Sequence, residues 1–438
     1  MNKLIQRIVL GGALLAGLFF VFSPSSSEKK QALGPMSQEV YIWQRVWTND
    51  VTTSVQERIG FFSHATLLVA EMNQVWSAED TGQWSVEVFS DPLRYTQDHP
   101  VTLAVRIGAG ASRSNWDPGA IAKVIHLLKP LSRQTQTFQI DYDCPSRKLD
   151  GYIKLCEAIK KNFPQHSLEI TCLPDWLNQN DFPLLIKRVD RFIMQVHGVL
   201  GYGKTLCDPA LARQTAQKCA HLGAPFLIAL PTYRHVVLRN DKAQIIQVIS
   251  EGGEIQTGKN YELMTARHGE IAALIRHWQK VRPASMEGVI WYRLPVRGDA
   301  MNWTWPSLQQ VMRGEVPEQK WTTAIKESVD GSYVLTLTNA TIANLEWPKQ
   351  IDISWDSGFC VAADQGPGFE LNQLSRQDGA RCRWRSFDLR PVPPNTSVFV
   401  AWFRFLPSDS PTFQLKITEK STSHDRNQLE SRKDDYEE

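Results

Sequence analysis

Apolar and polar positions follow two patterns along this chain. From residue 39 onward, short runs rich in β-branched and aromatic residues are separated by longer amphipathic stretches. The short runs have the length and composition of buried strands, whereas the longer stretches have the period of helices. The eight runs are Val40–Trp47, Ala65–Met72, Val101–Ile107, Thr137–Cys144, Ser167–Leu173, Arg191–His197, Pro225–Pro231 and Gly288–Leu294.

Helix-like segments lie between these runs, which indicates parallel strands joined by crossovers. Asp117-Pro118 and Asp208-Pro209 each place a capping aspartate before a proline, which is a helix start signal. Eight such units predict a (β/α)₈ TIM barrel over residues 39–315. A doubly wound open sheet is the alternative, but no Gly-rich dinucleotide turn supports it. The predicted helices are Pro118–Leu131, Lys148–Asn162, Phe182–Val189, Pro209–His221 and Arg267–Val281.

Two insertions interrupt this rhythm. Trp76–Pro100 follows the second run and contains the strand-like segment Trp84–Phe89. His235–Tyr261 follows the seventh run and predicts a hairpin with Gly252 and Gly253 near its turn.

After Arg313 only short alternating strands occur, without helical patterns between them. Residues 322–418 therefore predict a small C-terminal antiparallel β-sandwich. Residues 419–438 are charged and almost without apolar side chains, so we expect a disordered tail.

The first 27 residues have the features of an export signal. Lys3 and Arg7 precede an apolar run, Ile8–Phe22, and a short polar stretch follows. The run is short for a membrane span of roughly 20 residues. Because no small-x-small cleavage site follows, residues 8–22 are either a cleaved signal peptide or an inner-membrane anchor. We therefore expect an exported protein, periplasmic or anchored facing the periplasm, with residues 28–38 as a linker.

Composition excludes several classes of function. The chain of 438 residues has 48 Lys and Arg against 46 Asp and Glu, which gives no reason to expect nucleic-acid binding. Its seven cysteines are an odd count and include no CxxC pair, which argues against a zinc site or a redox dithiol. We expect no metal and no cofactor. Cys360 and Cys382 lie together in the C-terminal module and either form a disulfide or remain thiols.

In a barrel of this kind the functional residues lie at the C-terminal ends of the strands. Polar, charged and aromatic groups recur at those ends, which is typical of a site for a glycan or another polar ligand. The candidate catalytic residues are Asp143, Asp141, Glu71 and Asp175, and the candidate binding residues are Trp43, Arg45, Trp47, Arg106, Gln195, His197, Tyr233 and Trp291.

Asp141 and Asp143 are the strongest local signal. They alternate with Tyr142, so both share the inward face of the fourth strand with Gln139. Two inward carboxylates are costly unless they are paired, hydrogen-bonded or functional, and close acidic groups suit acid–base chemistry. The competing interpretation is a structural network with Arg45 or Arg106.

The fourth strand resembles the signature of the family eighteen glycoside hydrolases, the chitinases, which reads Asp-x-x-Asp-x-Asp-x-Glu. Its last three acidic positions fall on Asp141, Asp143 and Pro145. Leu230-Pro231-Thr232-Tyr233 is similar to the family's Pro-x-Tyr segment, and Gly288-Val289-Ile290-Trp291 resembles its Trp-bearing strand. The resemblance implies that Asp141 and Asp143 orient a sugar and that the Trp291 ring forms the floor of its subsite.

The chain departs from that pattern at the proton donor, which is replaced by Pro145, and at the first acidic position, which is Phe138. Glu71 or Asp175 would have to serve as the acid, or the chain is a non-catalytic envelope protein that binds ligands or acts as a scaffold. Glu71 itself is either a site residue or the ion-pair partner of Arg106. The barrel as a whole also resembles an uncharacterised family of exported bacterial proteins, a domain of unknown function.

Residues 198–205 match the G-x-x-x-x-G-K-T phosphate loop. A working loop of that type runs directly into a helix, whereas the next helix here is predicted at Asp208-Pro209. We therefore interpret its glycines as turns of a long loop over the barrel mouth.

Overall fold

Pairing of β2 (Ser37–Ile42) with both β3 (Ala65–Trp76) and β14 (Met286–Tyr292) closes a barrel of parallel strands in the computed structural model. The structure describes residues 31–76, 82–89, 93–96, 98–108, 111, 116–198, 205–242, 244–249, 261–385, 389–406 and 411–418. The strands lie in the order β2-β3-β5-β6-β7-β8-β9-β14, which confirms the (β/α)₈ prediction. The remaining strands are β5 (Val101–Ile107), β6 (Thr137–Tyr142), β7 (Ser167–Cys172), β8 (Arg191–Gln195) and β9 (Phe226–Pro231).

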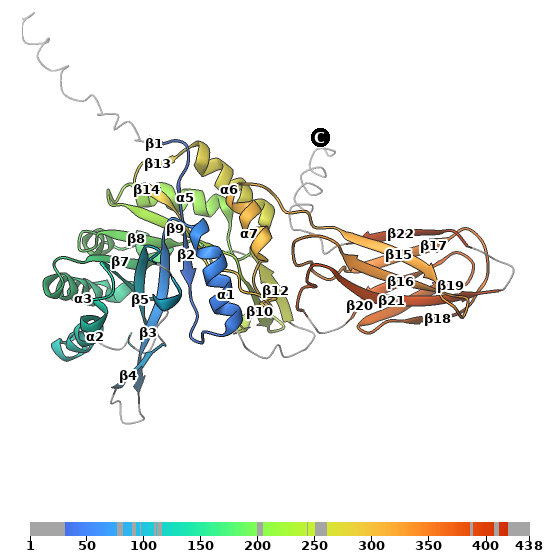
Figure 1. Cartoon of the computed structure of the whole chain (residues 1–438), viewed down its shortest axis with the longest axis horizontal. Helices are drawn as coiled ribbons and strands as arrows, with labels where there is room; N and C mark the ends of the chain where they lie inside the picture. The colour runs from blue at the N-terminus through green and yellow to red at the C-terminus, as the bar shows by residue number, and fades with distance from the viewer. Residues whose placement is uncertain are drawn as a thin grey trace, which may run out of the picture.

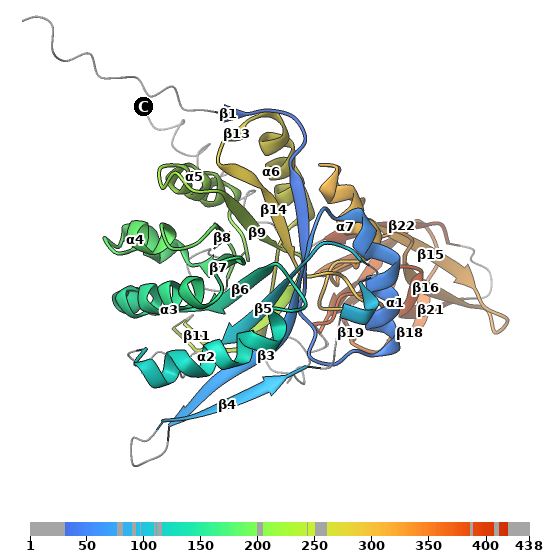
Figure 2. The same ribbon diagram turned by 60° about the vertical axis from the view of Figure 1, so that its left-hand side comes forward.

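Helices surround the barrel and bury the outward faces of its strands (Figures 1 and 2). The predicted caps are present: Asp117 accepts a hydrogen bond from the Ala120 amide at 2.9 Å, and Asp208 accepts one from the Ala210 amide at 2.7 Å. The helices are α1 (Asn49–Arg58), α2 (Pro118–Leu131), α3 (Leu149–Asn162), α4 (Phe182–Ile186), α5 (Pro209–Ala220), α6 (His268–Lys280) and α7 (Trp305–Met312).

The second strand–helix unit is the exception among the described residues. In place of a helix, β3 continues beyond the barrel and pairs with antiparallel β4 (Gly82–Val88), followed by the short 3₁₀ helix η2 (Leu93–Tyr95). Both views show this hairpin projecting from the barrel (Figures 1 and 2).

The second insertion forms a three-stranded sheet. Its central strand is β10 (Arg234–Arg239), flanked by β11 (Ile245–Ile249) and β12 (Tyr261–Thr265). The tight turn lies between β10 and β11, where the Asn240 amide donates to the Gln244 carbonyl at 2.9 Å. Gly252 and Gly253, where the sequence predicts the turn, lie outside the described residues.

A charged network fills the barrel interior below its C-terminal mouth. Arg191 donates to Glu39 at 2.6 and 2.9 Å and to Glu169 at 2.9 Å. Gln139 donates to Glu169 at 3.0 Å, and the Tyr41 hydroxyl donates to Gln139 at 2.8 Å. Because buried charges are tolerated only when paired, this network gives the barrel a fixed polar floor.

Two four-stranded antiparallel sheets pack face to face after the barrel, as the predicted β-sandwich requires. The sandwich contacts the barrel through the Asn344 side chain, which donates to the Asn302 carbonyl at 3.0 Å, and through Thr304, which donates to the Ile342 carbonyl at 2.6 Å. Its strands are β15 (Trp321–Glu327), β16 (Ser332–Asn339), β17 (Gln350–Trp355), β18 (Cys360–Gln365), β19 (Phe369–Ser375), β20 (Gly379–Trp384), β21 (Thr396–Phe405) and β22 (Phe413–Thr418).

The remaining sequence predictions concern the linker, the cysteines and the two ends of the chain. Part of the predicted linker is ordered, because β1 (Gln31–Ala32) pairs with β13 (Arg282–Pro283) and β2 begins at Ser37. All seven cysteines are buried free thiols, Cys360 and Cys382 included. No helix among the described residues is long and apolar enough to cross a membrane. The predicted export signal, residues 1–27, and the predicted tail, 419–438, lie outside the described residues.

Candidate functional site

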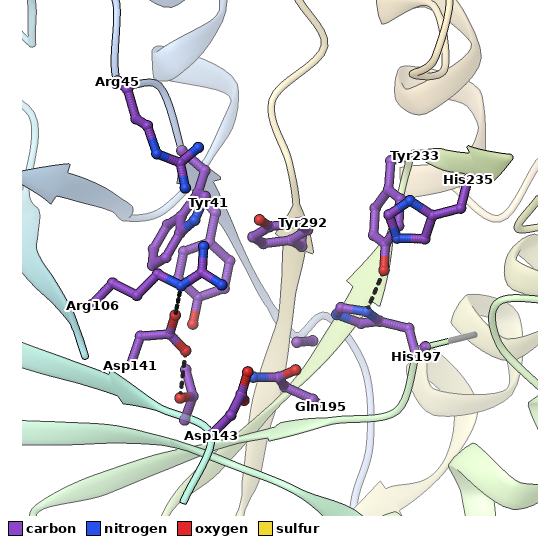
Figure 3. Close-up of a pocket in the computed structure, with 14 residues that line it drawn as sticks. Tyr41, Arg45, Arg106, Asp141, Asp143, Gln195, His197, Tyr233, His235 and Tyr292 are labelled. Atoms are coloured by element: carbon purple, nitrogen blue, oxygen red, sulfur yellow. Dashed lines mark hydrogen bonds and ion pairs between the residues drawn. The ribbon is translucent and has the colours of Figure 1, made fainter. Parts of the chain in front are cut away.

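A cavity of about 380 Å³ opens at the C-terminal face of the barrel (Figure 3). Its size is in the range of small-molecule sites, and it lies where this fold places its functional residues. The residues that line it come from seven barrel strands, the segments that follow them and β10. They are Tyr41, Trp43, Arg45, Arg106, Asp141, Asp143, Thr171, Gln195, His197, Gly198, Ala229, Tyr233, His235 and Tyr292.

Strand alternation turns the two aspartates into this cavity, as the sequence predicts. Gln139 and Asp141 share the inner face of β6 and Asp143 continues it just after the strand, whereas Tyr142 points outward and packs edge-to-face against Trp116. The alternation therefore fixes both carboxyl groups at the mouth, directly above the Gln139 side chain.

The Asp141 carboxylate is held from two sides. It accepts a hydrogen bond from the Thr171 hydroxyl at 2.7 Å and lies 3.8 Å from Arg106 Nε. Burial and the neighbouring Asp143 nevertheless raise the pKa of Asp141 to about 6, and Thr171 and Arg106 oppose that rise. Partial enclosure also raises the pKa of Asp143, again against the effect of Arg106. The two carboxyl groups can therefore retain a proton at mildly acidic pH.

Glu71 does not line the cavity. Its Oε1 accepts a hydrogen bond from Arg45 Nη2 at 2.6 Å and lies 3.6 Å from Arg106 Nη1. Only 12% of the Glu71 side chain is exposed, whereas Arg45 and Arg106 are 40% and 39% exposed. Glu71 thus anchors the two arginines from behind, which favours the structural interpretation of this carboxylate over its use as the acid.

Aromatic rings form the rest of the wall. Tyr41, Trp43 and Tyr292 meet edge-to-face, with centroids 5.3 to 5.8 Å apart. The His197 ring stacks on Tyr292 at 5.7 Å, and its Nδ1 is hydrogen-bonded to the Tyr233 hydroxyl at 2.9 Å. Figure 3 shows Tyr233, His197 and His235 opposite the charged side of the cavity, with Tyr292 between the two sides.

Both histidines of this wall are neutral at physiological pH. Burial lowers the pKa of His197 to about 3, and His235 lowers it further. Burial also lowers the pKa of His235 to about 4. The cavity therefore has one charged wall and one neutral aromatic wall.

Trp291 does not lie where the resemblance to chitinases implies, and this expectation is wrong. Its ring is fully buried on the outer face of the barrel strands, and its Nε1 donates a hydrogen bond to the Gln38 side chain at 3.1 Å. Alternation on β14 turns Tyr292 into the cavity instead. Trp291 therefore belongs to the packing between strand and helices.

Two other predicted residues are absent from the cavity lining. Trp47 follows β2 and stacks on Tyr95 of η2 at 5.3 Å, so it packs loops of the mouth together. Asp175 is exposed in the 3₁₀ helix Pro174–Asn178. Asp175 therefore does not join Asp141 and Asp143 in the lining of the cavity.

Trp43, Arg45, Arg106, Gln195, His197 and Tyr233 do line the cavity, as predicted. Sequence reasoning missed Tyr41 and His235 as lining residues, along with Tyr292. Tyr41 could have been found from alternation with Trp43 on β2. His235 could not, because it belongs to the inserted sheet, whose position over the mouth leaves no signal in strand order.

Pro145, at the position of the family's proton donor, precedes the 3₁₀ helix Ser146–Lys148.

The described residues do not support the phosphate-loop match. Residues 199–204 lie outside them, but the Thr205 hydroxyl donates to the Cys207 and Thr265 carbonyls, and α5 begins only at Pro209. Among the residues that the structure describes, no group of three or more His, Cys, Asp or Glu side chains could hold a metal.

Fold and site together define a (β/α)₈ barrel protein with a cavity at its C-terminal face. Residues 97–297 match a family model described as Domain of unknown function (DUF3142). That segment begins before β5 and ends after β14, so it contains every cavity residue except those of β2 and the segment after it. No curated protein sequence matches the chain.

Solved structures with a similar fold include glycoside hydrolases. The spore cortex-lytic enzyme SleL of Bacillus cereus is 9% identical, with a TM-score of 0.44 over 65% of this chain and 75% of that one. A chitinase from Bacteroides thetaiotaomicron is 11% identical, with a TM-score of 0.44 over 60% and 90%. The xylanase and alpha-amylase inhibitor protein XAIP-II of Scadoxus multiflorus is 9% identical, with a TM-score of 0.39 over 64% and 99%.

Proposed function

We propose that this protein is a carbohydrate-active protein of the cell envelope that binds a glycan in the barrel-mouth cavity. The observation that carries the proposal is the pairing of two different walls across one cavity. Trp43 and Tyr292 offer ring faces and edges to the apolar side of a sugar, whereas Asp141 and Asp143 offer acceptors for its hydroxyl groups. A few convergent polar groups in an aromatic pocket are typical of such sites.

The same carboxyl pair supports cleavage of a glycosidic bond. Hydrolysis needs one carboxyl group that donates a proton and a second that acts as base or nucleophile. Asp141, whose pKa is raised to about 6, and Asp143, whose pKa is also raised, supply both protonation states within one cavity. Asp143 is the more exposed of the two, so we assign it the contact with the reacting sugar.

A second candidate function is glycan binding without turnover. Pro145 favours it, because that position carries the proton donor in the family that the strand resembles. The Glu71–Arg45–Arg106 ion network favours it too, because it makes Glu71 a structural anchor. In this case the barrel would act as a receptor or scaffold for envelope glycans.

We further propose export, with residues 8–22 as a signal or inner-membrane anchor. A glycan ligand is consistent with that location, since envelope polysaccharides lie outside the cytoplasm. The basic start and the apolar run of the sequence are the support for this proposal.

The test measures binding and turnover separately. Chitotetraose and soluble peptidoglycan fragments are titrated by calorimetry, and new reducing ends are counted, for wild type and for Asp143→Asn, Asp141→Asn and Glu71→Gln. A hydrolase loses about 10²-fold or more of its turnover in Asp143→Asn while it still binds. The matched control is Asp175→Asn, an exposed aspartate outside the cavity, which retains wild-type turnover.

Binding without turnover in every form would leave the second candidate. Binding of no glycan by the wild-type protein would contradict both.

A further inference from the structure

Arg106, in the charged wall, forms two ion pairs with described residues, and both are long. Its Nη1 lies 3.6 Å from Glu71, and its Nε lies 3.8 Å from Asp141. Both distances exceed that of a hydrogen bond, and among the described residues its guanidinium makes none. A guanidinium carries five N–H donors, so most of the hydrogen-bonding capacity of Arg106 faces the cavity unused.

Other arginines within the barrel make short hydrogen bonds to acceptors of the protein. Arg191 donates to Glu39 and Glu169 at 2.6 to 2.9 Å, Arg293 donates to Asp299 at 2.8 Å, and Arg234 donates to the Asn302 carbonyl at 2.9 Å. Against these, the arrangement at Arg106 resembles a site that awaits an acceptor.

Arg45 lies beside it and shares its anchor. One Glu71 oxygen accepts from Arg45 at 2.6 Å and also faces Arg106. Because Glu71 is only 12% exposed, its charge lies behind the two guanidinium groups. Both arginines thus extend into the cavity from the side of Glu71. Figure 3 shows Arg45 and Arg106 on the same side of the cavity as Asp141.

We propose that Arg106, with Arg45 beside it, binds an anionic group on the glycan, so that the ligand is an acidic sugar. This inference rests on the proposed glycan function of the same cavity. Arginine's planar fork matches the two oxygens of a carboxylate, or two oxygens of a phosphate or sulfate ester. The opposite wall, with neutral His197 and Tyr233, then receives the uncharged part of the sugar.

The neighbouring carboxyl groups limit where the anion can lie. Glu71, Asp141 and Asp143 surround Arg106, and Asp141 lies on its Nε side. Glu71 lies on its Nη1 side, so an anion is expected at Nη2, the nitrogen that neither ion pair involves. A proton on the aspartate pair would reduce the repulsion of such an anion.

The test compares ligands that differ only in charge. Methyl β-D-glucuronide and methyl β-D-galacturonide are titrated against their methyl esters, and chitotetraose is titrated separately as a neutral glycan. Methyl β-D-glucoside 6-phosphate and 6-sulfate form a second arm that distinguishes a carboxylate from these esters. Wild type is expected to bind at least one acid about tenfold or more tightly than its uncharged counterpart.

In Arg106→Gln this ratio is expected to fall to about one, and Arg106→Lys should retain only part of it, because lysine keeps the charge without the fork. The matched control is Arg188→Gln, which removes a similarly exposed arginine that pairs with Glu157 on the barrel exterior. Thermal unfolding of each variant excludes loss of fold as the cause.

Binding of chitotetraose with no preference for any anionic ligand would overturn this inference and leave the proposed function standing. Equal preference in wild type and Arg106→Gln would also overturn it. Binding of neither class of ligand would contradict both proposals.

Discussion

The Thr171 hydroxyl on β7 donates a hydrogen bond of 2.7 Å to the Asp141 carboxylate on the neighbouring strand β6. This bond stabilises the ionised form of a carboxyl group whose pKa burial and Asp143 raise to about 6. Thr171 therefore controls how readily the pair gives up its proton, although it is not acidic itself.

Thr171→Val keeps the shape of the side chain and removes the donor. We expect the pKa of Asp141 to rise above its wild-type value, because the ionised form loses a hydrogen bond that is typically worth about 1.5–3 kcal/mol. Carbon-detected NMR titration of the Asp carboxyl groups measures this directly. Thr171→Ser, which keeps the hydroxyl, is the control, and an equal pKa in the valine and serine variants would contradict the argument.

The stability of the fold should depend on pH through Asp141. Its pKa is raised on folding, so between its unfolded value, near 4, and about 6 the folded state binds more protons than the unfolded state. Stability therefore decreases as pH rises through this window. Asp141→Asn removes the ionisation. We therefore expect its free energy of unfolding at pH 7.5 to exceed that of wild type by about 1–3 kcal/mol.

The groups that face Asp141 are Asp143, Thr171, Arg106 and Glu71, and all remain in that variant. The difference between the two proteins should therefore shrink as the pH falls from 7.5 to 4.5, which denaturant unfolding at both pH values measures. A difference that does not change with pH would show that lost contacts with Arg106, and not ionisation, decide the effect.

The sequence predicts the inward face of β6 correctly because charge marks it. Asp141 and Asp143 could not both point outward against the helices, so alternation fixes the orientation of the whole strand. The same reasoning fails on β14, where Val289, Ile290 and Trp291 are all apolar and buried. Parallel barrel strands are apolar on both faces, so the pattern there does not show which side faces the cavity.

The sequence offers the pairing of Glu71 with Arg106 as one of two interpretations but does not decide between them. Glu71 forms an ion pair with Arg45 and Arg106, but a register shift in β3 between Leu68 and Ala70 precedes it. Such a bulge shifts the pairing of every later residue in the strand by one position. An apolar run contains no sequence signal that predicts it. His235 reaches the cavity from an inserted sheet, which strand order alone cannot place.

Arg191 is the central residue of the network beneath the cavity, and no pattern in the sequence indicates that role. Arg191→Leu would leave Glu39 and Glu169 buried without their partner. Breaking one member of a buried ion cluster typically costs about 3–5 kcal/mol, so we expect a loss of that size in the free energy of unfolding. Urea denaturation measures it, and Arg188→Gln, on the surface with Glu157, should cost less than about 1 kcal/mol. A loss as small as that of the control would mean that the network rearranges or takes in water.

Tyr233 and His197 form the other half of the cavity, and their bond sets the histidine's orientation. The His197 Nδ1 to Tyr233 hydroxyl distance is 2.9 Å, and the buried Nε2 has no partner among the described residues. Tyr233→Phe would leave both ring nitrogens of His197 unsatisfied, at a cost of about 1–3 kcal/mol. Because burial lowers the pKa of His197 to about 3, the ring cannot compensate by taking up a proton near neutral pH. We therefore expect His197 to turn toward the ligand or toward water, and glycan affinity to change by about tenfold. Calorimetric titration checks the affinity, and NMR of the imidazole nitrogens checks the tautomer.

The double variant Tyr233→Phe/His197→Phe, which removes both partners, should recover much of the lost stability. If the double variant is no more stable than Tyr233→Phe alone, the hydrogen bond does not fix His197, and the stacking of its ring on Tyr292 at 5.7 Å would be the stronger constraint.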